Sequence, residues 1–386
     1  MNSLFKGIRK NVVVLSVTSL LTDISSEMLY PIIPIFLTSV LGAPMSVLGL
    51  IEGAAEATAS ILKAFSGWIS DVVGKRRPFV MGGYFLSALG KLLFFLAYSW
   101  PIVLLARLID RIGKGVRTSP RDAMIADSCD AEHRGKAFGF NRAMDRVGAC
   151  LGPLFAIWLL TALKEDLRVV FLIAFVPAIL AVGVLILFLK EVPIATRSNG
   201  VSFKVSARQF SPVFWKFLLI STVFAVGNSS DAFLIMRAKD IGLATVTVVL
   251  AYVVYNISSS VLSMPAGVIS DRLPRKAVMA GGYLIFALVY FGFAAWATKG
   301  AMWVLFFVYG FYMAMTDGVS KAFVTDTVDS SVRGTAIGLY YCVTGLATFF
   351  ASLIAGLLWT YVGSSAPFFY GAAMALISAL ALAIFI

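Results

Sequence analysis

The chain has 386 residues, of which 60% are hydrophobic and only 13% are charged, and its mean hydropathy is +0.91. Soluble domains are about 45–50% apolar and about 25% charged, so this composition excludes an ordinary soluble protein and indicates a membrane protein. The net charge of +12 is spread over short runs between apolar segments, which excludes a continuous nucleic-acid-binding face.

Apolar segments follow one another along the whole chain, and a helix needs about 20 such residues to span the bilayer. The sequence predicts twelve spans, at 11–41, 45–70, 77–99, 101–127, 136–163, 167–190, 212–237, 244–270, 275–297, 301–327, 334–362 and 366–386. A long first apolar run without a cleavage site argues against a signal peptide. We expect an all-α polytopic membrane protein with an N-terminal six-helix bundle (1–190), a cytoplasmic linker (191–212) and a C-terminal six-helix bundle (213–386).

Basic side chains gather in alternate links between the predicted spans. They lie before the first span, after the second and eighth spans and in the linker, whereas the links LGAPMS and YSWP contain none. By the positive-inside rule the basic links face the cytoplasm. We therefore expect an integral protein of the cell (inner or plasma) membrane with both termini in the cytoplasm.

The chain repeats itself at a near-constant spacing. GWISDVVGKRR, which holds Asp71, reappears as GVISDRLPRKA, which holds Asp271, 200 positions later. ADSCDAEHRGKAFGF and TDTVDSSVRGTAIGL match at an offset of 199, which aligns Asp127 with Asp326. A repeat through several spans predicts two pseudo-symmetric bundles of parallel topology, as in many secondary transporters that bind their solute near the midplane between the halves.

Four motifs carry a resemblance to a known family. GWISDVVGKRR is similar to the loop motif of the major facilitator superfamily, and GVISDRLPRKA resembles its second copy. RIGKG at Arg111 resembles the motif of that superfamily's fourth helix, and GACLGP at Gly148 resembles the start of its antiporter motif. Val72 and Pro274 depart from the loop pattern, and the missing small pair after Pro153 weakens the case for drug/proton antiport. The resemblance covers the whole chain and implies a twelve-helix secondary transporter similar to proton-coupled exporters.

The loop motif has the composition of a conformational gate. Its glycine allows close helix packing, and its aspartate can bind backbone amides or the neighbouring basic side chains. Such contacts can be remade between two states of similar energy, although the same residues could serve only as topology anchors. We expect cytoplasmic gate loops at Gly67, Asp71, Gly74, Lys75, Arg76, Gly267, Asp271, Arg272 and Arg275.

Gly148, Gly152 and Pro153 form a packing motif in the fifth span. Small residues let two membrane helices approach closely, and proline bends a helix. The motif predicts either a structural contact or a part in preventing leakage.

Ionisable residues inside the predicted spans form the candidate coupling site, because a charge in the bilayer core is costly and functional by default. Asp23 and Glu27 share one face of the first span, and we expect one of Asp23, Glu27 and Glu56 to reach Arg111. A carboxylate that leaves an arginine in a low dielectric can take up a proton. The alternative is that these charges only hold helices together. The candidates for proton coupling and charge pairing are Asp23, Glu27, Glu52, Glu56, Arg107, Asp110, Arg111, Arg142 and Asp145.

The second half is poorer in charge and richer in tyrosine, which favours contact with a solute. Its candidate cavity residues are Asn228, Asp231, Tyr252, Tyr255, Asn256, Asp317, Tyr340 and Tyr341.

The leading functional prediction is a proton-coupled exporter of a small organic solute that works by alternating access. Uptake or exchange of an organic anion is the alternative, because intramembrane arginines and lysines are in surplus, and a transport-inactive membrane sensor or accessory protein is a third. The chain has no phosphate-binding Gly-x-x-x-x-Gly-Lys-Ser/Thr loop, a single histidine and three unpatterned cysteines. We therefore expect no enzyme, cofactor or metal site, and a monomer whose partners are solute, protons and the lipid bilayer.

Overall fold

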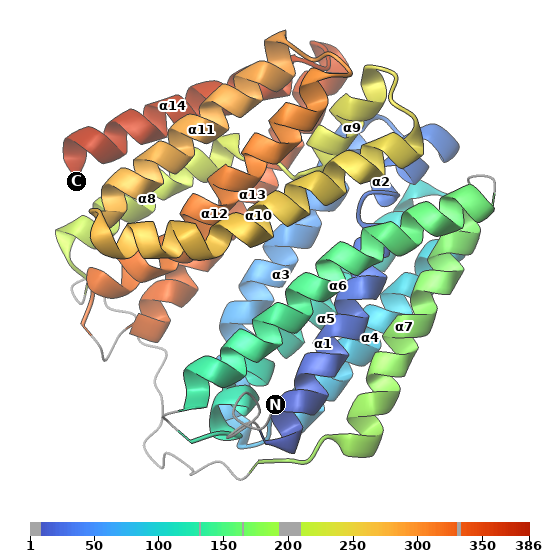
Figure 1. The fold of residues 1–386 in the computed structure, drawn as a ribbon, viewed down its shortest axis with the longest axis vertical. Coiled ribbons are helices and arrows are strands. Elements are labelled where there is room, and N and C mark those ends of the chain that lie inside the picture. Colours follow the sequence, from blue (N-terminus) through green and yellow to red (C-terminus); the bar gives the residue numbers. More distant parts are fainter. Residues whose placement is uncertain (1–8, 131–132, 164–165, 193–209, 330–332) are drawn as a thin grey trace. The chain divides into compact units, whose positions relative to one another are not determined.

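The computed structural model describes residues 9–130, 133–163, 166–192, 210–329 and 333–386, apart from the side chains of Val268 and Asp271. Every regular element in these ranges is helical, which confirms the predicted all-α architecture. Within these described ranges, eleven helical stretches are long and apolar enough to cross a membrane. The helix at the fourth predicted span is equally long but carries many charged side chains. Helices therefore occur at all twelve predicted spans (Figure 1).

The helices of the first half are α1 (Lys10–Leu29), α2 (Ile33–Ile35), the π-helix η1 (Phe36–Val40), α3 (Met45–Val73), α4 (Arg77–Phe95), α5 (Trp100–Asp127), α6 (Arg134–Ala162) and α7 (Leu167–Phe188). Those of the second half are α8 (Pro212–Gly227), α9 (Ala232–Asp240), α10 (Thr245–Arg272), α11 (Arg275–Ala295), α12 (Ala301–Asp326), α13 (Arg333–Tyr361) and α14 (Ala366–Phe385).

The chain divides into two compact units. Unit 1 comprises residues 1–32 and 58–203, and unit 2 comprises residues 33–57 and 204–386. Segment 33–57, which the prediction includes in the first bundle, groups with unit 2. The predicted linker falls largely on residues 193–209, which lie outside the described residues.

Two of the predicted spans are interrupted rather than continuous. The first consists of α1, α2 and η1, and its break follows Tyr30, where Pro31 removes a backbone donor and clashes with the preceding turn. The seventh consists of α8 and α9, separated at residues 228–231 (Figure 1). The sequence Gly-Asn-Ser-Ser-Asp at this second break is typical of a turn, a signal that the prediction of one helix over 212–237 missed.

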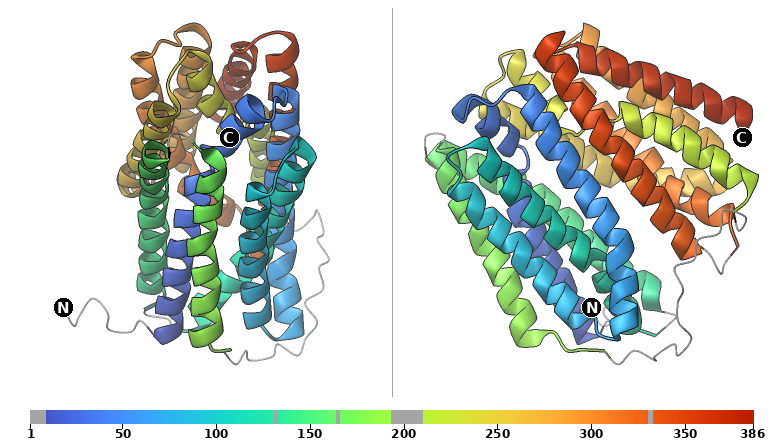
Figure 2. Two further views of the ribbon diagram at one scale, coloured as in Figure 1. Left: turned by 90° about the vertical axis from the view of Figure 1, so that its right-hand side faces the viewer. Right: turned by 180° about the vertical axis from the view of Figure 1, so that it is seen from behind.

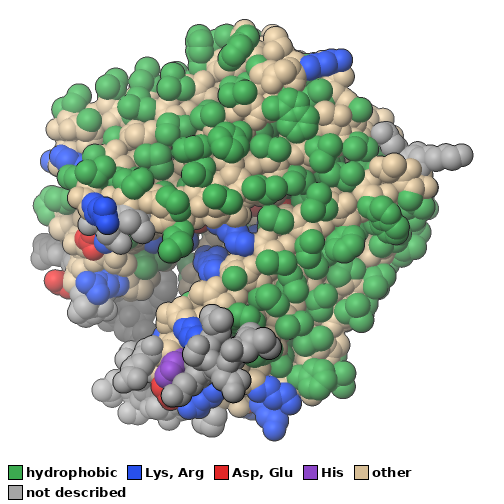
Figure 3. Space-filling model, in the orientation of Figure 1, with side chains coloured by type: hydrophobic (Ala, Val, Ile, Leu, Met, Phe, Trp, Pro, Cys, Tyr) green, Lys and Arg blue, Asp and Glu red, His purple; other side chains and the backbone are tan. Residues whose placement is uncertain are grey.

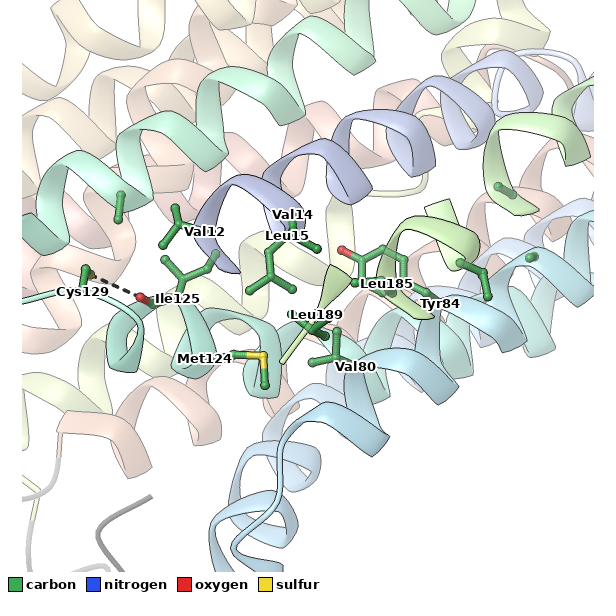
Figure 4. Packing of buried hydrophobic residues seen from close by; sticks show 14 residues of the cluster. Val12, Val14, Leu15, Val80, Tyr84, Met124, Ile125, Cys129, Leu185 and Leu189 are labelled. Carbon is green, nitrogen blue, oxygen red and sulfur yellow. Dashed lines mark hydrogen bonds between the residues drawn. The ribbon is translucent and has the colours of Figure 1, made fainter. Parts of the chain in front are cut away.

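The helices of unit 1 run side by side, with α1 against α6 and α7 and α4 against α5 and α7 (Figure 2). One end of this unit is held by an apolar cluster contributed mainly by α1, α4, α5 and α7, including Val12, Leu15, Val80, Met124 and Leu185 (Figure 4). Cys129 packs into the same cluster and donates to the Ile125 carbonyl at 3.2 Å, and burial raises the pKa of its thiol. Cys129 is therefore part of the packed interior of unit 1.

Segment 33–57 groups with unit 2 because the first half of α3 packs closely against α13. A Cβ atom on Gly53 would lie 2.7 Å from the Phe349 carbonyl oxygen, and one on Gly356 would lie 2.6 Å from that of Met45. The Ser46 N–H also donates to Thr360 Oγ1 at 3.0 Å. Small residues thus let two helix backbones meet, as is common between membrane helices.

Hydrophobic side chains are spread over the visible helix surface (Figure 3). Leu187 is 74% exposed, Trp158 65% and Leu288 71%. Soluble monomers rarely expose so continuous an apolar surface, so lipid is the solvent that this surface fits.

Candidate functional site

The break between α8 and α9 gathers the polar side chains of unit 2. Asn228 Nδ2 donates to the Tyr312 hydroxyl at 2.9 Å, and the Tyr309 hydroxyl donates to Asp231 Oδ1 at 2.7 Å. Both tyrosines come from α12, so this helix holds the break from one side. Interrupted membrane helices often mark solute sites because the unwound backbone offers unpaired polar groups there.

Glu52 reaches the same break from α3. Its side chain is 1% exposed, and its Oε2 accepts from Ser230 Oγ at 3.2 Å. The Ser230 N–H donates to Ser352 Oγ of α13 at 3.1 Å. Glu56 lies one turn further along α3 and is half-buried. The structure therefore places these two predicted coupling acids in unit 2.

Four tyrosines form a continuous aromatic group beside the break. The ring centroids of Tyr252 and Tyr255 are 5.6 Å apart, those of Tyr255 and Tyr309 are 5.1 Å apart, and those of Tyr309 and Tyr312 are 5.3 Å apart. Each is at most 5% exposed. Tyr252 and Tyr255 were predicted cavity residues, and the structure joins them to the tyrosines that bind Asn228 and Asp231.

The other predicted cavity residues are distributed over three places. Asn256 is buried on α10, one residue beyond Tyr255. Asp317 is exposed and pairs with Lys321 at 3.4 Å, and that lysine lies over the Tyr341 ring. Tyr340 stacks on Phe217 with centroids 5.8 Å apart, and it also acts electrostatically on Tyr312 of the group of four tyrosines.

The predicted acids of unit 1 come together where α1 and α6 cross. A Cβ atom on Gly148 would lie 2.9 Å from Asp23 Cβ, and one on Gly152 would lie 2.8 Å from Glu27 Cβ. The two glycines of the packing motif therefore bring α6 directly against the acidic face of α1. Asp145 stands one turn before Gly148, and it is the charged group with the largest electrostatic effect on Asp23, followed by Lys114, Glu27 and Arg117.

Helix α5 carries a row of cations into the interior of unit 1. Arg107 lies over the Tyr30 ring at 5.4 Å, and Arg111 Nε is 3.8 Å from Asp110 Oδ2. Arg111 is thus close to the acid next to it in the chain. Its predicted pairing with Asp23, Glu27 or Glu56 stays a prediction. The remaining candidate, Arg142 on α6, is exposed.

A polar network that the site prediction missed joins four helices of unit 1. The Ser19 and Tyr84 hydroxyls are 3.1 Å apart, and Arg121 Nη1 donates to Ser19 Oγ at 3.0 Å. Asn141 of α6 donates to the same hydroxyl at 3.4 Å. Arg117 lies over the Tyr84 ring at 4.3 Å. The spacing of basic residues along α5, at intervals of three and four, was a sequence signal for this face.

Arg76 organises the loop after α3, and only 8% of this residue is exposed. Arg76 Nη2 binds Asp71 Oδ1 at 3.0 Å, and Nη1 binds Asp127 at the end of α5. Glu191 accepts the backbone N–H groups of Arg76 and Arg77 at 3.2 and 3.1 Å, which stabilises the start of α4. We call Asp71, Arg76, Asp127 and Glu191 the Arg76 cluster. The predicted contact of Asp71 with a neighbouring basic side chain is therefore present.

The other predicted loop residues differ between the two copies. Gly74 has a φ of +69°, which favours glycine, and Lys75 is exposed. A Cβ on Gly67 would lie 3.0 Å from Ser119 Cβ, whereas one on Gly267 would meet no atom within 4 Å. Arg272 is exposed, and the Asp271 side chain lies outside the described residues.

The second copy keeps one ion pair of the first. Arg275 Nε lies 3.2 Å from Asp326 Oδ2, and each of these residues is 199 positions after its counterpart in the pair of Arg76 with Asp127. The Arg275 side chain is 27% exposed, compared with 10% for Arg76. The loop of the second half is therefore held by a more solvated contact.

The two copies provide a matched test of loop stability. Asp127→Asn is expected to lower the free energy of unfolding by about 1–3 kcal/mol, because it removes a charge-assisted contact of a buried guanidinium. Asp326→Asn is expected to cost less than about 1 kcal/mol, the scale of an exposed ion pair. Thermal unfolding of both variants in the same detergent measures the difference, and equal shifts would contradict the unequal roles given to the two loops.

Comparison with known proteins identifies the family. The model of the Major Facilitator Superfamily matches residues 15–254 and 232–386. The chain belongs to this superfamily. An uncharacterized MFS-type transporter of Methanocaldococcus jannaschii is 38% identical over 383 residues, which cover 98% of this chain and 95% of the relative. The protein is thus an integral membrane transporter of the major facilitator superfamily.

Two further similarities are partial or structural. The quinolone resistance protein NorA of Staphylococcus aureus is 26% identical over 144 residues, which cover 37% of each chain. A crystal structure of a D-xylose-proton symporter matches with a TM-score of 0.75 at 19% identity, over 98% of this chain and 97% of that one. The similarity to the D-xylose-proton symporter shows a shared fold only.

Proposed function

We propose that this transporter exports a small organic solute in exchange for protons. In this proposal unit 1 handles protons, and unit 2 provides the surface that selects the solute. In this proposal the working unit is a monomer in the cell membrane. Both termini lie in the cytoplasm, as the distribution of basic links predicts.

The observation that carries the proposal is the group of acids where α1 and α6 cross. Asp145 and Glu27 both act electrostatically on Asp23 inside membrane-spanning helices, and Lys114 and Arg117 act on it too. Three carboxylates so placed cannot all be ionised without strong repulsion, so the group is suited to holding a shared proton. A change in the position of a nearby cation would then release that proton.

The solute surface is proposed at the break between α8 and α9. Asn228, Asp231 and the tyrosines of α10 and α12 combine aromatic faces with a few fixed polar atoms, which is the usual make-up of a small-molecule site. Such a surface fits an amphipathic compound with an aromatic or cationic portion. The partial similarity to NorA, whose name refers to quinolone resistance, also favours export.

Exchange of organic anions is the second candidate. It is favoured by the buried cations of α4 and α5, which outnumber the buried carboxylates on these helices. An anionic solute would supply the missing counter-charge.

The test is proton movement in proteoliposomes that contain a pH-sensitive dye and start with an acidic lumen. Cationic, neutral and anionic organic solutes are added outside in parallel, with protein-free liposomes as the control. Export by antiport predicts that a transported cationic or neutral solute raises the luminal pH. Transport of a solute without any proton movement would refute the coupling, and transport restricted to anions would favour the second candidate.

A further inference from the structure

Lys91 is a buried lysine near the carboxyl end of α4. Its residue is 1% exposed, and its Nζ has no hydrogen-bond partner in the described part of the chain. An ammonium has three donors, and burying it without acceptors is costly. The adjacent Gly90 brings α4 against the backbone of α5, where a Cβ on this glycine would lie 2.8 Å from Asp110 N. Asp110 is accordingly the charged group with the largest effect on Lys91.

The charges that act on Lys91 come from two helices. Helix α5 contributes Asp110, Arg117 and Arg111, and α1 contributes Asp23. The remaining neighbour, α7, carries Arg168, which donates to the Phe95 carbonyl at 3.3 Å at the end of α4. The environment of Lys91 is therefore rich in cations and has Asp110 as its main counter-charge.

The buried charges on α4 and α5 are unbalanced. Asp110 is the buried carboxylate on the described residues of these helices, and it is accompanied by four buried cations in the interior of the unit: Lys91, Arg107, Arg111 and Arg117. A surplus of positive charge in a low-dielectric interior is costly. Arginine keeps its proton in proteins, whereas lysine can lose its own. Within this group of cations, only Lys91 can reduce the surplus by changing its charge.

We propose that Lys91 is a proton-carrying residue of the transport cycle and that Asp110 is its positioning counter-charge. The proposal rests on the proposed proton coupling and names a carrier outside the acidic group of α1 and α6. The ε-amine binds one proton while the Asp110 carboxylate faces it. It returns the same proton to water when a conformational change separates the two side chains, so the step forms and breaks one N–H bond.

Two substitutions distinguish a proton-carrying role of Lys91 from an anion-binding or structural role. Lys91→Arg keeps a permanent charge, and Lys91→Met keeps the length without a charge. Both are expected to reduce pH-gradient-driven transport about tenfold or more, the scale of a coupling free energy between two sites. Both should retain counterflow exchange of labelled solute, because exchange needs no net proton movement. Lys216→Met, on α8 of unit 2, is the control for loss of a lysine.

The transport activities of the two Lys91 variants decide whether the proposal holds. Gradient-driven transport by Lys91→Arg would mean that a fixed charge is sufficient, as for an anion-binding or structural role, and would overturn the proposal. Transport by Lys91→Met would overturn it by showing that no charge is required.

A second measurement does not depend on transport or on the folding of the Lys91 variants. Acetylation of the purified protein by acetic anhydride over a series of pH values is followed by mass spectrometry at Lys91 and Lys216. The midpoint at Lys91 is expected to move by about one pH unit or more in Asp110→Asn, and that at Lys216 to stay. If the Lys91 midpoint does not move in Asp110→Asn, the proposed link between Lys91 and Asp110 is wrong. If the midpoint moves but the unmodified protein shows no transport driven by a pH gradient, the link holds and only the proposed proton coupling is wrong.

Discussion

Asp23→Asn and Glu27→Gln are each expected to reduce pH-gradient-driven transport about tenfold or more while counterflow exchange continues. The physical reason is that each change removes a carboxylate from the group that can share a proton with Asp145. Proteoliposomes measured with and without a pH gradient separate the two activities. Asp130→Asn is the matched control, because Asp130 forms an exposed ion pair with Arg9 that contributes little.

Asp145→Asn completes this series. If gradient-driven transport survives each of the three substitutions, the acids are structural and the proposed proton site is wrong. If exchange is lost together with driven transport, the affected acid is required for solute handling or folding rather than for coupling. Chromatography of each variant in detergent distinguishes those last two causes.

Gly152→Ala is expected to lower the free energy of unfolding by about 1–3 kcal/mol, the typical cost of overpacking, and Gly152→Leu to prevent assembly of unit 1. A Cβ at this position would lie 2.6 Å from the Ile24 carbonyl oxygen of α1, so the two helices would have to separate. Separation would also displace Glu27 from α6. Thermal unfolding in detergent measures the loss of stability.

Gly139 provides the control on the same helix, since a Cβ there would meet no atom within 4 Å. Gly139→Ala is expected to be neutral or to stabilise by up to about 1 kcal/mol, because alanine is the better helix former. Similar stability in the two alanine variants would contradict the close contact between α1 and α6.

Most spans were predictable because they are long apolar runs, and such runs have one physical explanation in a bilayer. The fourth span is the exception, since its helix carries many charged side chains. The break at residues 228–231 was hidden by the apolar residues on either side, although its Gly-Asn-Ser-Ser-Asp composition was a visible turn signal. The repeat was equally informative. It aligned Asp127 with Asp326, and each aspartate binds an arginine at the start of the preceding helix of its half, α4 or α11.

The partners of the buried charges were not predictable from depth alone. Asp23 and Arg111 have similar depths, but depth does not determine how each helix is rotated about its axis. The structure places Arg111 beside Asp110 and brings Asp145 into range of Asp23. The partner of Glu52, Ser230, lies 178 residues away, and its contact arises only because the first half of α3 belongs to unit 2.

The division of α3 between the two units limits how this protein can be taken apart. Cutting the chain between residues 192 and 210 would leave Glu52 and Gly53 on the amino-terminal fragment and their partners Ser230 and Phe349 on the other. The amino-terminal fragment would then carry segment 33–57 without its partners, and the carboxyl-terminal fragment would lack that segment. Split versions of the transporter should therefore be produced together in one membrane, because unit 2 is incomplete without segment 33–57 of the amino-terminal fragment.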